Sequence, residues 1–264
     1  MKLGIIGLGN MASAILGGII KEKIVPVKQI IGADVSEEGR AKAKKQFKIC
    51  VTEDNKEVVE KAELIILAVK PQFYKEVIRE IRDLVREDQI VVTIAPGKTL
   101  AWLTDKFEKE VKLVRTMPNT PALVGMGMTA MCPNDQMTKE EIDYVRSLLE
   151  SFGKVEIVSE KLMDVVVSTS GSSPAYVFML IEAMADAAVA GGMPRQQAYL
   201  FAAQAVLGSA QMVLETGKHP GELKDMVCSP GGTTIEAVRV LEKRGFRSAV
   251  MEAMKVCEEK SKTM

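Results

Sequence analysis

The sequence lacks most of the features that mark metalloproteins, secreted proteins and nucleic-acid-binding proteins. Its 264 residues include one histidine and four cysteines, and Cys50, Cys132, Cys228 and Cys257 form no C-x-x-C pair or other metal-ligand spacing. Lysine and arginine balance aspartate and glutamate at 35 each, so no net charge attracts nucleic acid or an anionic membrane. We therefore expect no metal site, no nucleic-acid partner, and free thiols in a reducing cytoplasm.

Long apolar runs and targeting segments are also missing. No uninterrupted apolar run reaches the roughly 20 residues that a membrane-crossing helix needs. A strand-like run begins directly after Met1, which predicts neither a signal peptide nor a transit peptide. With 47% hydrophobic residues, the chain can bury the core of one large or two moderate domains. These features favour a cytoplasmic globular protein without a membrane partner.

A glycine-rich turn follows the first apolar run. Lys2 to Ile6 has the pattern of a buried strand, and it leads through Gly7-Leu8-Gly9-Asn10-Met11-Ala12 into a helix-like segment. In a dinucleotide-binding turn, the first glycine permits the tight bend, the second leaves room for the pyrophosphate, and the third small residue lets the helix pack closely on the strand. The strand before and the helix after make this pattern specific, and it predicts a bound NAD(P)H.

An acidic residue ends the second strand-like run. Gln29 to Ala33 leads to Asp34, about 20 residues past the glycines, where a carboxylate commonly binds the ribose hydroxyls of the adenosine. A carboxylate at that position repels a 2′-phosphate, which favours NADH over NADPH. Nearby basic residues offer an offsetting attraction or, alternatively, form only a solvated helix face: Arg40, Lys42 and Lys44.

Two further apolar strands end in small residues and prolines. Leu64 to Val69 is followed by Lys70 and Pro71, and Ile90 to Ile94 is followed by Ala95-Pro96-Gly97. Open α/β sheets bind ligands at the carboxyl ends of their strands. We interpret both segments as parts of the cofactor site, the alternative being that they only end the strands.

The pattern changes near residue 160. Over residues 1–159, strands alternate with charged amphipathic helices, which predicts a parallel sheet in an α/β, Rossmann-type dinucleotide-binding domain. Over residues 160–264, strand signals vanish. Between Leu162 and Thr216 the charged residues are Asp164, Glu182, Asp186, Arg195 and Glu215. Helices this apolar must be buried, so we expect an all-α dimerisation domain that a second copy covers.

The helix boundaries of this second half are legible. Proline suits the first turn of a helix, and glycine commonly ends one. The expected starts and stops are therefore Ser173-Pro174, Gly191-Gly192, Pro194, Gly217 and Pro220, with a last helix from Phe246 toward Lys260.

A second anion-binding pattern lies between Met226 and Val238. Its centre is Ser229-Pro230-Gly231-Gly232-Thr233-Thr234, in which Pro230 suits the first turn of a helix and the glycines let the backbone approach a ligand. The free N–H groups and the positive dipole end of such a helix favour a carboxylate or a phosphate. An ordinary loop that enters a helix, with Ser229 as its cap, is the alternative.

Taken together, these motifs resemble those of the pyrroline-5-carboxylate reductases, over essentially the whole chain. The matching segments are Gly7-Leu8-Gly9-Asn10-Met11, Ala68-Val69-Lys70-Pro71, Met117-Pro118-Asn119-Thr120-Pro121, Ser170-Gly171-Ser172-Ser173-Pro174-Ala175-Tyr176 and Ser229-Pro230-Gly231-Gly232-Thr233-Thr234. The resemblance implies a Rossmann domain, an all-helical dimerisation domain, and an active site where the cofactor of one subunit meets the helices of its partner. It also implies a homodimer and, as in several members, a pentamer of dimers.

The resemblance assigns residues to both ligands. Substrate contacts are expected at Glu160, Gly232, Thr233 and Thr234, and the pattern of the turn itself adds Ser229 and Gly231. Cofactor contacts are expected at Ile6, Gly7, Leu8, Gly9, Asn10, Met11, Asn55, Ala68, Val69, Lys70, Pro71, Ile94, Ala95 and Pro96, and the sequence argument adds Asp34. Some relatives have small or neutral residues at the position of Asp34. The resemblance therefore does not carry their NADPH preference over to this chain.

The expected reaction is hydride transfer from NAD(P)H to the imine carbon of 1-pyrroline-5-carboxylate, which yields L-proline. A protonated imine already accepts hydride well, so positioning and electrostatics can suffice without a strong protein acid. This suits a chain whose single histidine, His219, precedes a helix-starting proline. We expect the Thr234 hydroxyl to be the catalytic group, hydrogen-bonded to the ring nitrogen of the substrate.

Two other functions stay open at this point. One is a related two-domain reductase for a β-hydroxy acid or another imine, although such hydroxy-acid enzymes generally need a lysine or histidine acid, and Leu162 to Thr216 contains neither. The other is a non-catalytic dinucleotide-binding module whose apolar helices serve only assembly.

Overall fold

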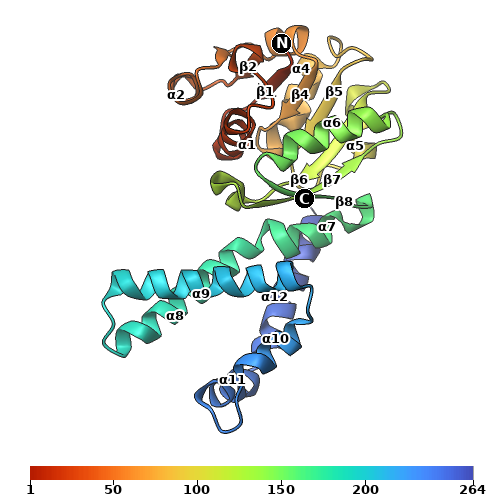
Figure 1. Ribbon diagram of the computed structural model, residues 1–264. Coiled ribbons are helices and arrows are strands. Elements are labelled where there is room, and N and C mark those ends of the chain that lie inside the picture. Colours follow the sequence, from red (N-terminus) through yellow and green to blue (C-terminus); the bar gives the residue numbers. More distant parts are fainter. Residues whose placement is uncertain (264) are drawn as a thin grey trace. The chain divides into compact units, whose positions relative to one another are not determined.

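A computed structural model describes residues 1–263, which form two compact units (Figure 1). Unit 1 comprises Met1–Ser172 and the residues from Cys257 onward, and unit 2 comprises Ser173–Val256. Residues 160–172 thus belong to the compact α/β unit, whereas the sequence pattern predicts that they belong to the helical domain. The division into domains over 1–159 and 160–264 stays a prediction.

Unit 1 is built on an eight-stranded sheet with the order β3-β2-β1-β4-β5-β6-β7-β8. Strands β1 to β6 are parallel, while β7 is antiparallel to β6 and parallel to β8. The order reverses between β1 and β4, which is where open α/β sheets bind ligands. The strands are β1 (Leu3–Ile6), β2 (Ile30–Ala33), β3 (Cys50–Thr52), β4 (Leu64–Leu67), β5 (Ile90–Thr93), β6 (Lys112–Met117), β7 (Gly127–Pro133) and β8 (Gly153–Ile157).

Helices cover both faces of this sheet (Figure 1). One face packs against α1 (Asn10–Lys21), α2 (Glu37–Phe47) and α6 (Lys139–Glu150). The other face packs against α3 (Asn55–Lys61), α4 (Tyr74–Ile81) and α5 (Leu100–Phe107). Because both faces are covered, β1, β2 and β4 contain no polar side chain, which explains the continuous hydrophobic runs in the sequence.

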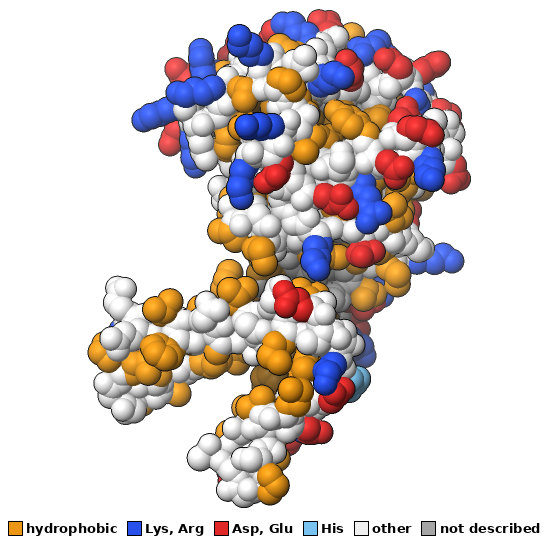
Figure 2. Space-filling model, viewed as in Figure 1, with side chains coloured by type: hydrophobic (Ala, Val, Ile, Leu, Met, Phe, Trp, Pro, Cys, Tyr) orange, Lys and Arg blue, Asp and Glu red, His pale blue; other side chains and the backbone are white. Residues whose placement is uncertain are grey.

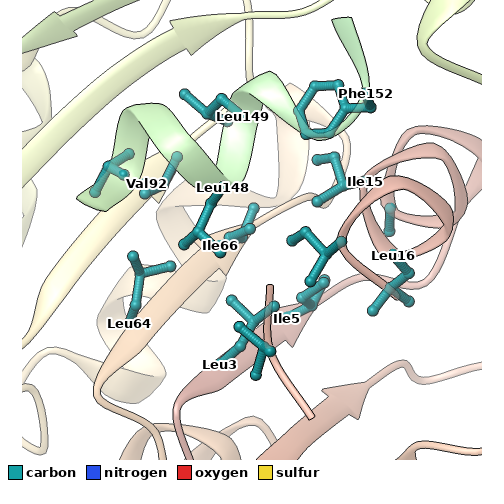
Figure 3. Packing of buried hydrophobic residues seen from close by; sticks show 14 of the residues in the cluster. Leu3, Ile5, Ile15, Leu16, Leu64, Ile66, Val92, Leu148, Leu149 and Phe152 are labelled. Carbon is teal, nitrogen blue, oxygen red and sulfur yellow. The ribbon is translucent and has the colours of Figure 1, made fainter. Parts of the chain in front are cut away.

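The core on the first face shows how one helix is fixed over the strands that carry the glycine turn. Ile15 and Leu16 of α1 lie over Leu3 and Ile5 of β1, and Leu148 of α6 lies beside Ile66 of β4 (Figure 3). All six side chains are at most 2% exposed. Burying such a side chain stabilises the fold by about 1.5–3 kcal/mol, so this packing fixes the start of α1 relative to the end of β1.

Unit 2 consists of helices. They are α8 (Ser173–Ala190), α9 (Arg195–Thr216), α10 (Pro220–Val227), α11 (Thr233–Lys243) and α12 (Phe246–Lys262), of which α12 ends in unit 1. The expected boundaries are confirmed: α8 begins at Ser173, Pro194 precedes α9, Gly217 ends α9 in the left-handed conformation with φ +64°, and α10 begins at Pro220. Two short elements precede α8 in the sequence. They are α7 (Met163–Val166) and a π-helical turn, Val167–Gly171.

Helices α8 and α9 pack against each other but leave most of their apolar surface exposed. In α9 only Ala198 and Ala202 are buried, while Leu200 is 67% exposed and Phe201 is 65% exposed. Figure 2 shows charged side chains gathered on unit 1 and mainly apolar or uncharged atoms over these two helices. The described residues of a single chain therefore do not bury α8 and α9 as the sequence predicts.

One stretch also meets the length and composition of a membrane-spanning helix. It is Glu160–Ala190, and 6% of its most apolar window is buried. The sequence expectation concerned an uninterrupted apolar run, whereas this stretch is interrupted by the polar turn around Val167–Gly171. Length and composition alone are weak grounds for a membrane span, and a surface that a partner covers has the same character.

Candidate functional site

The glycine turn lies at the switch point of the sheet. Gly7 follows β1 with φ +95°, and a Cβ there would lie 2.8 Å from the carbonyl carbon of Ala68 and 2.9 Å from the nitrogen of Val69. Both the backbone conformation and this close approach to the end of β4 require glycine. The turn therefore brings the predicted cofactor residues of β1 and β4 together.

The N-terminus of α1 faces open space. Gly9 is its N-cap, no side chain caps the helix, and its first turn carries no acidic residue. A Cβ on Gly9 would meet no described atom within 4 Å, so the protein itself does not demand a glycine there. The uncapped N–H groups, the helix dipole and this space suit a pyrophosphate. Asn10 and Met11 are the first two residues of this helix.

Asp34 joins the end of β2 to the glycine turn. Its Oδ2 accepts a hydrogen bond from the Leu8 N–H at 2.7 Å, and its Oδ1 accepts one from the Ser36 N–H at 2.8 Å. The Arg40 guanidinium donates to the carbonyl oxygens of Asp34 at 2.8 Å and Val35 at 3.1 Å. The negative charge of Asp34 is thus held at a fixed place, and Arg40 is engaged by the backbone.

A cavity of about 520 Å³ opens beside Asp34. This size suits a small-molecule ligand. Its lining consists of Ile6, Gly7, Asp34, Val35, Asn55, Val69, Phe73, Glu76, Val77, Arg79 and Glu80. Five of these are predicted cofactor residues, which the structure brings together: Ile6, Gly7, Asp34, Asn55 and Val69.

The sequence did not predict the remaining residues that line the cavity. Val35 is 89% exposed and Phe73 is 48% exposed, so both present apolar surface to the cavity without being core residues. Arg79 contributes a cation from α4. The signal that could have identified Val35 and Phe73 is their position after the ends of β2 and β4, at the ligand-binding edge of the sheet. Asn55 donates from its amide to the Glu80 carboxylate at 2.8 Å, which fixes its side chain.

The two segments that follow β4 and β5 lie at the same edge. Ala68 and Val69 are half-buried, Lys70 is exposed, and Pro71 begins a short 3₁₀ helix, Pro71–Phe73. After β5, Ile94 and Pro96 are half-buried and Ala95 is 3% exposed.

Tyr74 connects these two segments. Its hydroxyl donates to the carbonyl oxygen of Leu67, the last residue of β4, at 2.5 Å and accepts from the Ile94 N–H at 3.3 Å. The side chain is 0% exposed. Burial raises the pKa of the Tyr74 hydroxyl, and the N–H groups of Ile94 and Ala95 lower it to a smaller extent. The group therefore stays protonated and remains a donor.

Glu160, a predicted substrate residue, lies in unit 1 and has two partners there. Its Oε1 accepts from the Leu100 N–H at the start of α5 at 2.6 Å and from the Arg115 guanidinium at 2.9 Å. The Arg115 side chain is 5% exposed, whereas that of Glu160 is 32% exposed. Burial and the nearby Glu160 charge raise the pKa of the Cys132 thiol, which favours the neutral thiol over the reactive thiolate.

The other predicted substrate residues lie in unit 2, from the turn after α10 to the first two residues of α11. The expectation that Pro230 starts a helix is wrong, because the next residue, Gly231, has φ +66° and α11 begins only at Thr233. Gly232 is the N-cap, and a Cβ there would lie 2.3 Å from the Ser229 hydroxyl oxygen, so Ser229 packs directly against this glycine. Ser229 therefore shapes the turn without capping the helix.

The N-terminus of α11 retains the features of an anion site. No side chain caps it, and Thr233 and Thr234 are its first two residues. Gly231 and Thr233 are exposed, while Gly232 and Thr234 are half-buried. Free N–H groups, two hydroxyls and the positive end of an 11-residue helix thus converge at the predicted substrate turn.

Comparison with known proteins identifies both halves of the chain. Residues 160–264 match a family model described as pyrroline-5-carboxylate reductase dimerisation, and residues 2–97 match one described as NADP oxidoreductase, coenzyme F420-dependent. The pyrroline-5-carboxylate reductase of Escherichia coli strain K12 is 54% identical over 263 residues, covering 100% of this chain and 98% of its own. The reductase of Methanosarcina acetivorans is 41% identical over 263 residues, covering 100% and 97%.

Solved structures agree with these similarities. A pyrroline-5-carboxylate reductase from Coxiella burnetii superimposes with a TM-score of 0.92 at 33% identity, covering 99% of this chain and 97% of its own. Plasmodium falciparum pyrroline carboxylate reductase with NADP bound superimposes with a TM-score of 0.91 at 32% identity, covering 100% and 97%.

Proposed function

The chain belongs to the pyrroline-5-carboxylate reductase family, and we infer that it reduces 1-pyrroline-5-carboxylate to L-proline with a hydride from NAD(P)H, the last step of proline biosynthesis. The observation that carries this inference is the similarity over the full chain to reductases of that name, at 54% identity for one of them. The uncapped α1 behind the glycine turn gives the cofactor a place to bind. No comparison favours a hydroxy-acid reductase or a non-catalytic module.

We propose that unit 1 binds the cofactor along the carboxyl ends of its strands. Gly7, Gly9 and the first turn of α1 would hold the pyrophosphate, and Asp34 would bind the adenosine ribose. The cavity beside Asp34 would take the adenine, with Phe73 and Val35 providing apolar contact. The residues after β4 and β5 would then border the nicotinamide, which supplies the hydride when bound.

NADH is the proposed preference. The Asp34 carboxylate is fixed by two backbone N–H groups, so it cannot turn away from a 2′-phosphate without breaking both hydrogen bonds. Arg40, the nearest candidate to offset that charge, donates to backbone carbonyl groups and forms an ion pair with Glu53 at 3.4 Å. Arg79 is the cation that lines the cavity and would supply any remaining attraction to a phosphate.

For the substrate, we propose a site at the N-terminus of α11. The N–H groups from Gly231 to Thr233 would bind the carboxylate, because they are uncapped and lie at the positive end of the helix dipole. The Thr234 hydroxyl would hydrogen-bond the ring nitrogen and orient the imine carbon toward the cofactor. The protein would then act by positioning the substrate and by favourable electrostatic contacts with it, while the protonated imine is the electrophile.

A homodimer accounts for the exposed apolar helices. The segment that matches the dimerisation model begins at residue 160 and includes α8 and α9, whose apolar side chains one chain leaves exposed. We propose that a second copy covers them and that the dimers assemble further into a pentamer of dimers. We place the protein in the cytoplasm, where the free thiols of its four cysteines would stay reduced.

The decisive assay follows the oxidation of NADH and NADPH by the purified protein with 1-pyrroline-5-carboxylate. Wild type should turn over with both cofactors and with a higher kcat/KM for NADH. Thr234→Ala should lower kcat by about tenfold or more, and Thr234→Ser, which keeps the hydroxyl, should recover most of it.

Three outcomes would change the proposal. Turnover by Thr234→Ala at the wild-type rate would remove the catalytic role of Thr234. A strong NADPH preference would keep the reaction and discard the role of Asp34. Absence of turnover with either cofactor would overturn the assignment as a reductase of this substrate.

A further inference from the structure

We propose that Tyr74 is a positioning residue for the cofactor: its hydroxyl separates the ends of β4 and β5 and thereby sets the gap between the two segments that border the nicotinamide. This inference rests on the proposed cofactor site. It concerns a side chain that is not itself among the residues lining the cavity and that acts through the backbone of Leu67 and Ile94.

The hydrogen-bond pattern of the sheet shows what Tyr74 replaces. Between β1 and β4, Ile6 is paired with Leu67, and the next residue along, Ala68, donates its N–H to the Ile6 carbonyl oxygen at 2.8 Å. In this way the parallel ladder continues one residue beyond the strands.

Between β4 and β5, the register pairs Leu67 with Thr93. The regular continuation would therefore have the Ile94 N–H donate directly to the Leu67 carbonyl oxygen. Instead, the Tyr74 hydroxyl lies between them, donating to Leu67 at 2.5 Å and accepting from Ile94 at 3.3 Å. One oxygen atom is thus inserted into the ladder, and the two backbones diverge where β4 and β5 end.

The inserted hydroxyl is locked in place. Tyr74 is the first residue of α4, its ring belongs to the apolar core beneath the sheet, and its side chain is 0% exposed. Water is therefore a poor substitute for this oxygen, and each of the two backbone groups would lose a partner with it. Leaving a buried polar group without a partner costs about 1–3 kcal/mol, which favours keeping the bridge.

The position of the bridge connects it to the cofactor. The residue after Leu67 begins the predicted cofactor segment Ala68 to Pro71, and Ile94 is itself the first residue of the segment Ile94 to Pro96. Tyr74 also follows directly on the 3₁₀ helix Pro71–Phe73, so the first segment is tied at both of its ends. Removing the hydroxyl frees the two segments to move relative to each other.

Tyr74→Phe tests this role, because it deletes one oxygen atom and keeps the ring. NADH binding is titrated by the fluorescence of the bound cofactor, well below the thermal midpoint of either protein, and the kinetic constants are measured in parallel. We expect the dissociation constant of NADH to rise on the order of tenfold, with a matching rise in the KM for NADH. Tyr144→Phe is the matched control, since that tyrosine is half-buried in α6, away from this edge, and should bind NADH as wild type does.

A merely structural role gives a different result. In that case Tyr74→Phe lowers the thermal midpoint while the dissociation constant of NADH stays at the wild-type value, and the proposal is overturned. If Tyr74→Phe does not fold, Tyr74→Met is titrated in its place, because its flexible side chain fills the space of the ring and lets the ladder close. Failure of both variants to fold also counts against the proposal, since the hydroxyl would then be a requirement of the fold.

The wild-type titration separates this inference from the proposed function. If wild type binds neither NADH nor NADPH, the proposed function fails. If wild type binds and Tyr74→Phe binds equally well, only the role of Tyr74 fails.

Discussion

At the scale of single residues, we propose two functions for Asp34 at the edge of the cavity. Its carboxylate fixes the glycine turn through the Leu8 N–H, and it places a negative charge where the adenosine ribose would lie. These functions can be separated, because an amide side chain keeps one acceptor oxygen for the Leu8 N–H but carries no charge, at the cost of the hydrogen bond from the Ser36 N–H.

Asp34→Asn should therefore shift the cofactor preference while leaving the protein folded. We expect the KM for NADPH to fall by about tenfold, since a full charge no longer repels the 2′-phosphate at short range. The KM for NADH should rise a few-fold, because the hydrogen bonds to the ribose lose their charge. Initial rates at varied cofactor concentration give both values.

Glu38→Gln is the control for this variant. It also removes an acidic charge, from the first turn of α2, but Glu38 does not line the cavity. An equal shift in both variants would mean that net charge, and not the position of Asp34, sets the preference.

Tyr74 gives a prediction on pH dependence. Its pKa in the folded protein lies above the ordinary value of 10.0, because burial disfavours the phenolate. A raised pKa contributes stability that is fully present below about pH 10 and is lost as the pH rises further. The wild-type free energy of unfolding should thus fall more steeply between pH 9 and pH 11 than that of Tyr74→Phe, as measured by urea denaturation. Parallel declines would show that Tyr74 does not titrate with unfolding.

Individual site residues were predictable to different degrees. Gly7 and Gly9 follow a fixed spacing after a strand, and Asp34 follows at the expected distance, so local patterns sufficed. Arg79 carries no such signal, because it lies inside α4 and reaches the cavity only through the way that helix packs on the sheet. The bridge made by Tyr74 was equally unpredictable from the sequence, since it requires Leu67, Tyr74 and Ile94 to come together in the fold.

At the scale of elements, Glu160 connects parts of unit 1 that are distant in the sequence. It holds the start of α5 through the Leu100 N–H and β6 through Arg115. A charge-assisted hydrogen bond to a helix N-terminus and a buried partner for Arg115 both favour a structural role. The substrate contact expected for Glu160 stays a prediction beside it.

Glu160→Ala should lower the free energy of unfolding by about 3 kcal/mol, because it leaves the buried Arg115 guanidinium without its partner. Urea denaturation at one fixed protein concentration measures the change. Glu156→Ala, at an exposed site in β8, should change it by less than about 0.5 kcal/mol. A Glu160→Ala protein with unchanged stability and a raised KM for the substrate would instead support the substrate role.

The elements themselves followed closely from the sequence. The helix boundaries at Ser173, Pro194, Gly217 and Pro220 were predictable because proline and glycine restrict the backbone locally. The prediction that a helix starts at Pro230 was wrong, although it rested on the same property of proline. Pro230 suits a helix start, but the left-handed conformation of Gly231 delays α11 to Thr233.

At the scale of the whole molecule, the exposed apolar surface of α8 and α9 sets the assembly. Leu200 and Phe201 are each about two-thirds exposed, at 67% and 65%. Apolar patches of this kind on a single chain mark an interface. The sequence predicted that these helices must be buried, yet the surface that buries them belongs to another copy and is not encoded in any local pattern.

Phe201→Glu should therefore break the dimer. A charge at the centre of an apolar interface loses its hydration without gaining a partner, which costs several kcal/mol. Size-exclusion chromatography with light scattering should show the mass fall toward 28.8 kDa, the mass of one chain. Ile24→Glu, a comparable change at a 39% exposed site in unit 1, should leave the assembly intact. A Phe201→Glu protein that keeps its wild-type mass would place the interface elsewhere.

The chain order of unit 1 has a consequence for biosynthesis. Residues 257–263 belong to unit 1, and the buried Ser261 hydroxyl donates to the Asp164 carboxylate at 2.7 Å. A ribosome must therefore translate all of unit 2 before it releases the residues that complete unit 1. The nucleotide-binding half can begin to fold early, but its last packing step waits for nearly the entire message to be read. A premature stop codon in α11 or early in α12 would leave both units incomplete.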